Sequence, residues 1–206
     1  MKKKQFESLC HEVLPSLPGL KCKGWLLFMP PMSHLLRGFC CDGSGFDKTK
    51  FTVYVFVLPL YVPTTHVYFL FGHRLRDELG CEMWWDLNDS KCAENLAARV
   101  QTQGMPFLNR IDSSARLLEV AAELPAVQAP YKWETVAYSY LMLDDIAAAR
   151  DSLEHLVAAL DATVPWQAEM LERALLLKQK LSTDPREAKQ LLEQWEQVSL
   201  RNLGLL

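Results

Sequence analysis

The chain has 206 residues, of which 50% are hydrophobic and 23% are charged, a composition typical of a globular protein with a buried core. Lys and Arg number 22 against 25 Asp and Glu, and the formal net charge of -3 argues against a nucleic-acid-binding protein, because such domains are usually basic. Pro59 and Pro63 interrupt the longest apolar stretch, which falls short of the roughly 20 apolar residues that a membrane helix needs.

The N-terminal segment is expected to be a solvated tail that leads into a short helix. Lys2–Lys4 account for much of the basic excess of residues 1–50, which hold eight Lys and Arg against four Asp and Glu. No uninterrupted apolar segment follows these lysines, so we expect no secretory signal and a cytoplasmic location. The apolar residues Phe6, Leu9 and Val13 recur at the spacing of a helix.

Three strands are expected next along the chain. Gly24–Met29 is a short apolar run, and Leu35–Cys41 is a second candidate strand that the turn sequence Asp42–Gly45 follows. The third, Phe51–Leu58, is apolar at nearly every position instead of alternating. A strand with one wet face would alternate, so this pattern indicates a strand that is covered on both faces.

A return strand and a long helical part complete the predicted fold. Pro63–Thr65 gives a short loop, so a strand over His66–Gly72 is expected to pair antiparallel with Phe51–Leu58. Helical periodicity then dominates, over residues 91–103, 112–124, 131–143, 145–161, 165–181 and 185–202. We predict an α+β fold with a small antiparallel sheet around an aromatic-rich hairpin, followed by helical hairpins. The predicted domains are a sheet domain, 1–89, and a helical domain, 90–206.

The last four predicted helices form two hairpins with an offset of about 39 residues, judged from Ala149 and Ala188. The first hairpin resembles a tetratricopeptide unit at its packing positions, which are Trp133, Val136, Ala137, Tyr140, Ile146, Ala149 and Leu153. In the second hairpin Ala188 and Leu192 fit this pattern, whereas Leu176 and Gln179 depart from it. The resemblance covers about a third of the chain and implies helical-hairpin packing. An ordinary antiparallel bundle is the alternative.

We find no recognisable catalytic, cofactor or metal motif in the sequence. Gly43–Thr49 superficially resembles a phosphate loop, but Asp47 precedes Lys48 and a strand follows, so a hairpin turn is expected. The cysteines are irregularly spaced without a CxxC pair, which argues against structural zinc and favours reduced, mostly buried thiols. They are Cys10, Cys22, Cys40, Cys41, Cys81 and Cys92. We therefore expect no cofactor and no metal.

The densest polar cluster beside apolar sequence follows the return strand, and it is formed by His73, Arg74, Arg76, Asp77, Glu78, Glu82 and Asp86. Two tryptophans, Trp84 and Trp85, lie inside this cluster. Adjacent side chains cannot both point inward from a regular element, so one tryptophan is expected to be partly exposed. Exposed Trp and Arg together are typical of hot spots in protein interfaces. We predict a partner-binding loop made by Trp84, Trp85, Arg74, Arg76 and Asp86.

The predicted function is a non-catalytic module that binds a protein partner of unknown identity. The N-terminal half, with Gly24-Trp25, Pro59–Pro63 and Phe71–Leu75, resembles small bacterial domains, some of which are linked to toxin neutralisation or conflict systems. This resemblance implies an immunity or adaptor protein. Residues 144–206 hold seven Lys and Arg against eleven Asp and Glu, which makes the helical half a second candidate surface for a basic partner.

Two alternative functions stay open from the residues alone. One is a hydrolase or nucleic-acid-processing enzyme with a site near His66, His73, Arg74 and Asp86. That function requires a pocket that gathers these side chains, with at least one strongly shifted pKa among them. The other alternative is a structural subunit of a larger complex, which would be poorly soluble alone.

Overall fold

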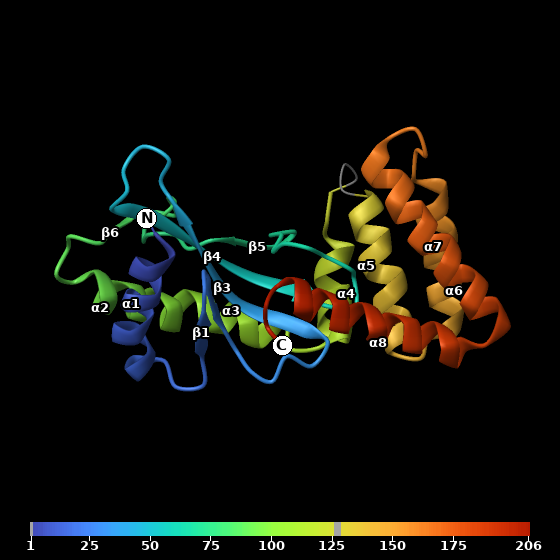
Figure 1. Cartoon of the computed structure of the whole chain (residues 1–206), viewed down its shortest axis with the longest axis horizontal. Helices are drawn as coiled ribbons and strands as arrows, with labels where there is room; N and C mark the ends of the chain where they lie inside the picture. The colour runs from blue at the N-terminus through green and yellow to red at the C-terminus, as the bar shows by residue number, and fades with distance from the viewer. Residues whose placement is uncertain (1, 126–128) are drawn as a thin grey trace. The chain divides into compact units, whose positions relative to one another are not determined.

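The computed structural model describes residues 2–125 and 129–206 and has the predicted α+β class (Figure 1). The chain divides into two compact units. The first unit comprises the described residues up to Leu58 together with Tyr68–Asp112. The second unit comprises Pro59–Val67 together with the described residues of Ser113–Leu206.

The first unit contains the sheet. Its strands are β1 (Lys21–Lys23), β2 (Leu26–Phe28), β3 (Leu35–Gly43), β4 (Lys50–Pro59), β5 (Phe71–Arg74) and β6 (Trp85–Asp86). They follow the order β1-β2-β3-β4-β5. Strand β6 pairs with Lys50 and Phe51, the first two residues of β4. The helices of this unit are α1 (Lys3–Val13), α2 (Cys92–Arg99) and α3 (Met105–Arg110). The expected α1 and the strands over β2 and β3 are confirmed, with ends that differ by a few residues.

Strand β4 is the centre of the sheet and is covered on both faces, as its unbroken apolar sequence predicts. All of its residues are buried except Lys50 and Tyr54. It pairs antiparallel with β5, with Tyr54 opposite Arg74 and Val57 opposite Phe71. The antiparallel return of the chain is therefore confirmed.

The connection between β4 and β5 is longer than the sequence predicts, because the return strand begins at Phe71 instead of His66. Pro59–Val67 is not a hairpin turn but part of the second unit. Leu60 and Tyr61 are fully buried there, and the Tyr61 hydroxyl lies 2.6 Å from Ser139 Oγ. A local turn pattern does not reveal this burial, because the partners of Tyr61 lie far along the chain.

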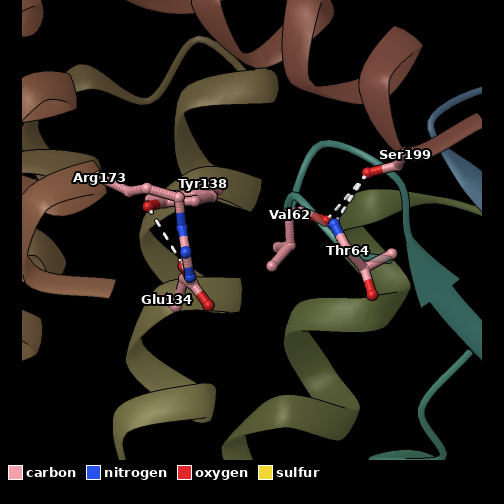
Figure 2. A network of polar contacts seen from close by, with 6 residues as sticks. All are labelled: Val62, Thr64, Glu134, Tyr138, Arg173 and Ser199. Carbon is pink, nitrogen blue, oxygen red and sulfur yellow. Dashed lines mark hydrogen bonds and ion pairs between the residues drawn. The ribbon is translucent and has the colours of Figure 1, made fainter. Parts of the chain in front are cut away.

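The end of this inserted segment is fixed to helix α8 (Pro185–Asn202). Ser199 Oγ accepts a hydrogen bond from the Thr64 backbone N–H and donates one to the Val62 carbonyl, each at 3.3 Å (Figure 2). The Asn202 side-chain amide donates to the Thr64 carbonyl at 3.0 Å. The backbone polar groups of a buried loop must find partners, and α8 supplies them here.

The sequence predicts that a helix ends before Gly104 and Pro106, but the helical chain continues through both residues. A π-helical stretch, Val100–Gly104, joins α2 directly to α3. Gly104 permits a close approach, since a Cβ at this position would collide with the ring of Phe39. Pro106 is the second residue of α3. Residues 90–112 belong to the first unit.

The second unit is built from helices and the inserted segment. Its helices are α4 (Ser114–Ala122), α5 (Ala129–Met142), α6 (Ile146–Ala158), α7 (Pro165–Thr183) and α8. Ser113, Asp145 and Asp184 cap α4, α6 and α8 by accepting a hydrogen bond from a backbone N–H of the first turn. All five helices occur where the sequence predicts them. The expected small packing residues Ala149 and Ala188 are both fully buried.

Candidate functional site

An exposed tryptophan beside a buried one marks the candidate site in the first unit. Trp85 is 3% exposed and stacks on Phe51, with ring centroids 5.9 Å apart. Its neighbour Trp84 is 51% exposed. The expected split between the two side chains is confirmed. We refer to residues 76–89, which carry both, as the tryptophan loop.

A second apolar side chain, Leu79, extends from the tip of the tryptophan loop and is 88% exposed. The turn below it is held by Asp77, whose Oδ1 accepts hydrogen bonds from the backbone N–H groups of Leu79 and Cys81, both at 2.9 Å. The Asp77 N–H also donates to the Cys81 carbonyl at 2.8 Å. Gly80 has a φ of 80°, which side chains other than hydrogen disfavour. Leu79 is thus presented to solvent by a fixed turn.

Arg74 joins the tryptophan loop to the sheet. Its Nη1 donates to Glu82 Oε2 at 2.6 Å, and its Nη2 donates to Asp42 Oδ2 at 3.0 Å. The guanidinium lies 4.9 Å from the ring centroid of Tyr54, which stacks in turn on Phe69 at 4.0 Å. The hydrogen bond to Glu82 raises the pKa of Arg74. Strands β3 and β5 and the loop therefore meet at one cation.

The other two predicted site residues lie at the two ends of the tryptophan loop. The Arg76 backbone N–H donates to Gln103 Oε1 at 2.7 Å. Asp86 Oδ1 accepts from the Asn88 N–H at 2.9 Å. Of the five predicted residues, Trp84 presents its ring to solvent, while Trp85 is an anchor in the core. The other three hold or flank the loop.

The sequence reasoning missed Leu79 and Phe46 as site residues. Phe46 lies in the connection between β3 and β4, and its side chain is fully exposed. The start of β4, which follows this connection, pairs with β6. Leu79 and Phe46 each adjoin a glycine in a turn sequence, in Asp77–Gly80 and in Gly43–Asp47. An apolar residue within a turn sequence predicts an exposed apolar side chain, because turns lie on the protein surface.

The tryptophan loop is strongly acidic. It holds five Asp and Glu against one arginine, which gives a formal charge of -4. Glu82 is paired with Arg74, and its side chain remains 51% exposed. The surface around Trp84 thus combines apolar side chains with negative charge.

The residues of the alternative enzyme site do not fall in one unit. His66 belongs to the second unit, while His73, Arg74 and Asp86 belong to the first. His73 contacts the ring of Phe107 edge-on, with centroids 4.9 Å apart. Burial, followed by the nearby cations Arg76 and Arg110, lowers the pKa of His73. Arg74 is bound by the carboxylates of Glu82 and Asp42.

Metal binding finds no support in the part of the chain that the structure describes. No group of three or more His, Cys, Asp or Glu side chains is placed to hold a metal ion there. All six cysteines are free. The thiols of Cys10 and Cys22 are hydrogen-bonded to each other, and this bond lowers the pKa of Cys22. Cys81 is exposed, in contrast to the expectation of mostly buried thiols, whereas Cys10, Cys41 and Cys92 are buried.

A buried ion pair in the second unit escaped the sequence reasoning (Figure 2). Glu134 on α5 is 3% exposed, and its Oε1 accepts from Arg173 Nη2 of α7 at 2.9 Å and from the Tyr138 hydroxyl at 3.4 Å. Burial raises the pKa of Glu134, and the charge of Arg173 opposes this shift. Its enclosure makes this cluster a packing element and not a contact surface. The position of Glu134 among apolar residues of α5 is the sequence feature that could have indicated a buried ion pair.

Comparisons with known proteins add no assignment. A scan against protein-family models, a search of curated proteins and a search of solved structures each gave no significant match. Within the described residues, none of the helices has both the length and the apolar character needed to cross a membrane.

Proposed function

We propose that this chain is a non-catalytic protein-binding module and that the tryptophan loop is its contact surface. The observation that carries the proposal is the split between Trp85, which is buried on Phe51, and Trp84, which is 51% exposed. One tryptophan is enough to anchor the loop. The second one places a large apolar ring in water, where it adds little to the fold.

The rigidity of the loop supports this proposal. Arg74, the Asp77 turn and the Trp85 anchor hold Trp84 and Leu79 in place before any partner arrives. Ordering a loop on binding costs free energy, so a surface that is already ordered binds more tightly. Tryptophan at such a place is the residue type most enriched among interface hot spots.

The finer role that we propose is that of an adaptor or immunity protein, which holds or neutralises a second protein. A module of this kind needs a rigid contact surface and no reacting groups. Its acid–base residues would then serve the geometry of the loop, as Arg74 and Asp77 do.

The proposal is tested by placing a photo-crosslinking amino acid at position 84 in the full chain, inside the cells that produce the protein. Position 166 is the matched control, because Trp166 is also an exposed aromatic and is 41% exposed. We expect one protein to be cross-linked from position 84 and not from position 166. Trp84→Ala should then weaken the purified complex by about 30-fold, the effect of losing roughly 2 kcal/mol at a hot spot. An unchanged affinity would refute the contact surface.

A second candidate function is that of a structural subunit. Tyr131 on α5 and Trp166 on α7 stack with centroids 5.1 Å apart and an interplanar angle of 4°, and both side chains are exposed. This stack lies in the second unit and suits a contact with another subunit. Cross-links that form from position 166 but not from position 84 would favour this function over the first.

A further inference from the structure

Helix α1 and the chain from Leu87 to Gln101 border two hollows in the first unit. One has a volume of about 350 Å³ and the other of about 400 Å³. Glu12 and Ala93 line both, so the hollows adjoin each other. We refer to them together as the α1–α2 groove.

Several small side chains line the α1–α2 groove. Ser8 lies on α1, and Ser16 follows the end of that helix. Ala93 and Ala97 are four residues apart and share one face of α2. Because these side chains are short, they leave the groove open.

The groove is negatively charged. Its walls carry the carboxylates of Glu12, Asp89 and Glu94, and the residues that line it in the described chain include no Lys, Arg or His. Asp89 Oδ1 accepts one hydrogen bond, from the Lys91 N–H at 2.9 Å. Glu12 and Glu94 make no ion pair or side-chain hydrogen bond with the other described residues.

The thiol of Cys92 lies within reach of these carboxylates. Cys92 is 5% exposed and lines the first hollow. Its pKa is raised to about 11, first by burial and then by the negative charges of Asp89, Asp86 and Glu12. A thiolate at this place is disfavoured by the same charges that would attract a cation.

The groove is continuous with the tryptophan loop. The segment that carries Trp84 runs on through Leu87 to Ser90, which line the first hollow. The Leu87 N–H donates to the Thr49 carbonyl at 2.9 Å, which fixes this segment to the start of β4. One partner surface can therefore contact Trp84 and reach into the groove.

We propose that the α1–α2 groove receives lysine or arginine side chains of the partner protein that the tryptophan loop binds, so that the partner presents a basic surface. This inference rests on the proposed function. Charge complementarity selects the occupant, because the groove and the loop are both acidic. The length of Lys and Arg side chains suits a channel with a small-residue floor.

The test measures binding of fluorescein-labelled hexalysine to the full chain by fluorescence anisotropy. The test variant is Glu12→Gln with Glu94→Gln, and the matched control is Glu123→Gln with Glu172→Gln, which makes the same change of net charge on exposed residues of the second unit. We expect the test variant to raise the Kd about fivefold and the control to leave it within twofold. Equal weakening in both variants, or none in the test variant, would overturn the proposal.

A second measurement locates the bound peptide. Amide signals of Ala93 and Ala97 should shift in NMR spectra when hexalysine is added, while the signals of α7 should stay in place. Shifts spread evenly over both units would count against the groove.

The design separates this inference from the proposed function. Hexalysine has no apolar side chain, so Trp84→Ala should leave its affinity within twofold. If hexalysine distinguishes the variants but position 84 cross-links no protein, the proposed function fails and the groove remains a cation site without a partner. If position 84 cross-links a protein but hexalysine does not distinguish the variants, only the groove assignment fails.

Discussion

Arg74 in the first unit and Arg173 in the second are both bound by a carboxylate, and these two arginines are equally accessible. The side chains of Arg74 and Arg173 are both 26% exposed, and they contact Glu82 and Glu134 at 2.6 Å and 2.9 Å. The difference lies in the partners. Glu82 is 51% exposed, whereas Glu134 is 3% exposed.

This difference assigns the two ion pairs different roles. An exposed pair contributes about 0–1 kcal/mol, so Arg74 matters for the shape of the tryptophan loop more than for stability. A buried carboxylate loses its hydration, and Arg173 must offset that loss. The exposure of the acid, and not that of the arginine, decides which pair the fold depends on.

The largest expected effect on stability follows from replacing Arg173 in the second unit. Arg173→Met leaves Glu134 buried and unpaired, and it should lower the free energy of unfolding by about 3 kcal/mol. Urea denaturation followed by amide exchange in α5 and α7 measures this change. Glu134→Gln with Arg173→Met removes both charges and should recover most of the loss. A loss below about 1 kcal/mol in the single variant would show that Arg173 contributes no more to stability than an exposed ion pair does, and it would refute the difference between Arg173 and Arg74.

The pH dependence of the same variant sharpens the comparison. Burial places the pKa of folded Glu134 above its ordinary value of 4.5, and loss of Arg173 raises it further. The penalty of the buried charge is therefore present above the folded pKa and disappears as pH falls to 4.5. The gap in stability between Arg173→Met and the parent protein should shrink between pH 7 and pH 4.5. A gap that stays constant would contradict the ionised state of Glu134.

Two connecting segments extend the comparison, since Pro59–Val62 is buried and the part of the tryptophan loop that carries Leu79 and Trp84 is exposed. Tyr61→Phe removes the hydroxyl that lies 2.6 Å from Ser139 Oγ and leaves buried serine hydroxyls with one partner fewer. We expect a loss of about 1–2 kcal/mol in thermal or urea unfolding. Trp84→Ala, in the exposed segment, should change stability by less than about 0.5 kcal/mol. Equal losses would show that the two segments support the fold alike.

Arg74→Met should have a small effect on stability and a larger one on the loop. We expect a change below about 1 kcal/mol in the free energy of unfolding. The amides of Cys81 and Met83 should exchange about tenfold faster, because the loop loses the ion pair between Glu82 and Arg74 of β5. Hydrogen exchange read by NMR measures both quantities, and Arg116→Met is a control with an exposed pair outside the loop. Unchanged amide exchange in Arg74→Met would show that Arg74 does not stabilise the tryptophan loop.

The smallest expected effect concerns His73. Burial and two nearby arginines hold its pKa below the ordinary value of 6.5 in the folded state. The unfolded chain therefore binds more protons between the two values, so the free energy of unfolding falls as pH drops through 6.5 and levels off below the folded pKa. His73→Phe should reduce this slope in urea denaturation between pH 7.5 and 5. An identical slope in the variant would assign the pH response to other groups.

Local patterns predicted much of the fold because they report local causes. The unbroken apolar run of β4 predicted its central place, and Asp184 with Pro185 predicted the start of α8. The split between Trp84 and Trp85 followed from the alternation of side chains alone.

The missed features depend on partners far along the chain. Tyr61 meets a serine 78 residues away, and Glu134 meets an arginine 39 residues away. Nothing in a local window distinguishes a proline-rich turn from a segment that a second unit buries. Gly104 was read as a helix stop, although its role is to admit the ring of Phe39. The candidate loop was predictable, while the groove needed the placement of α1 beside α2.

The order of synthesis gives Pro59–Val67 a further significance. The ribosome releases this segment before any of the helices that bury it, and Ser199, which binds Thr64, follows 135 residues later. Leu60 and Tyr61 therefore stay exposed to water until those helices have been synthesised. Exposed apolar segments of nascent chains attract chaperones and other unfinished chains. Because Pro59–Val67 belongs to the second unit, its apolar side chains are buried only after the helices of that unit have been synthesised.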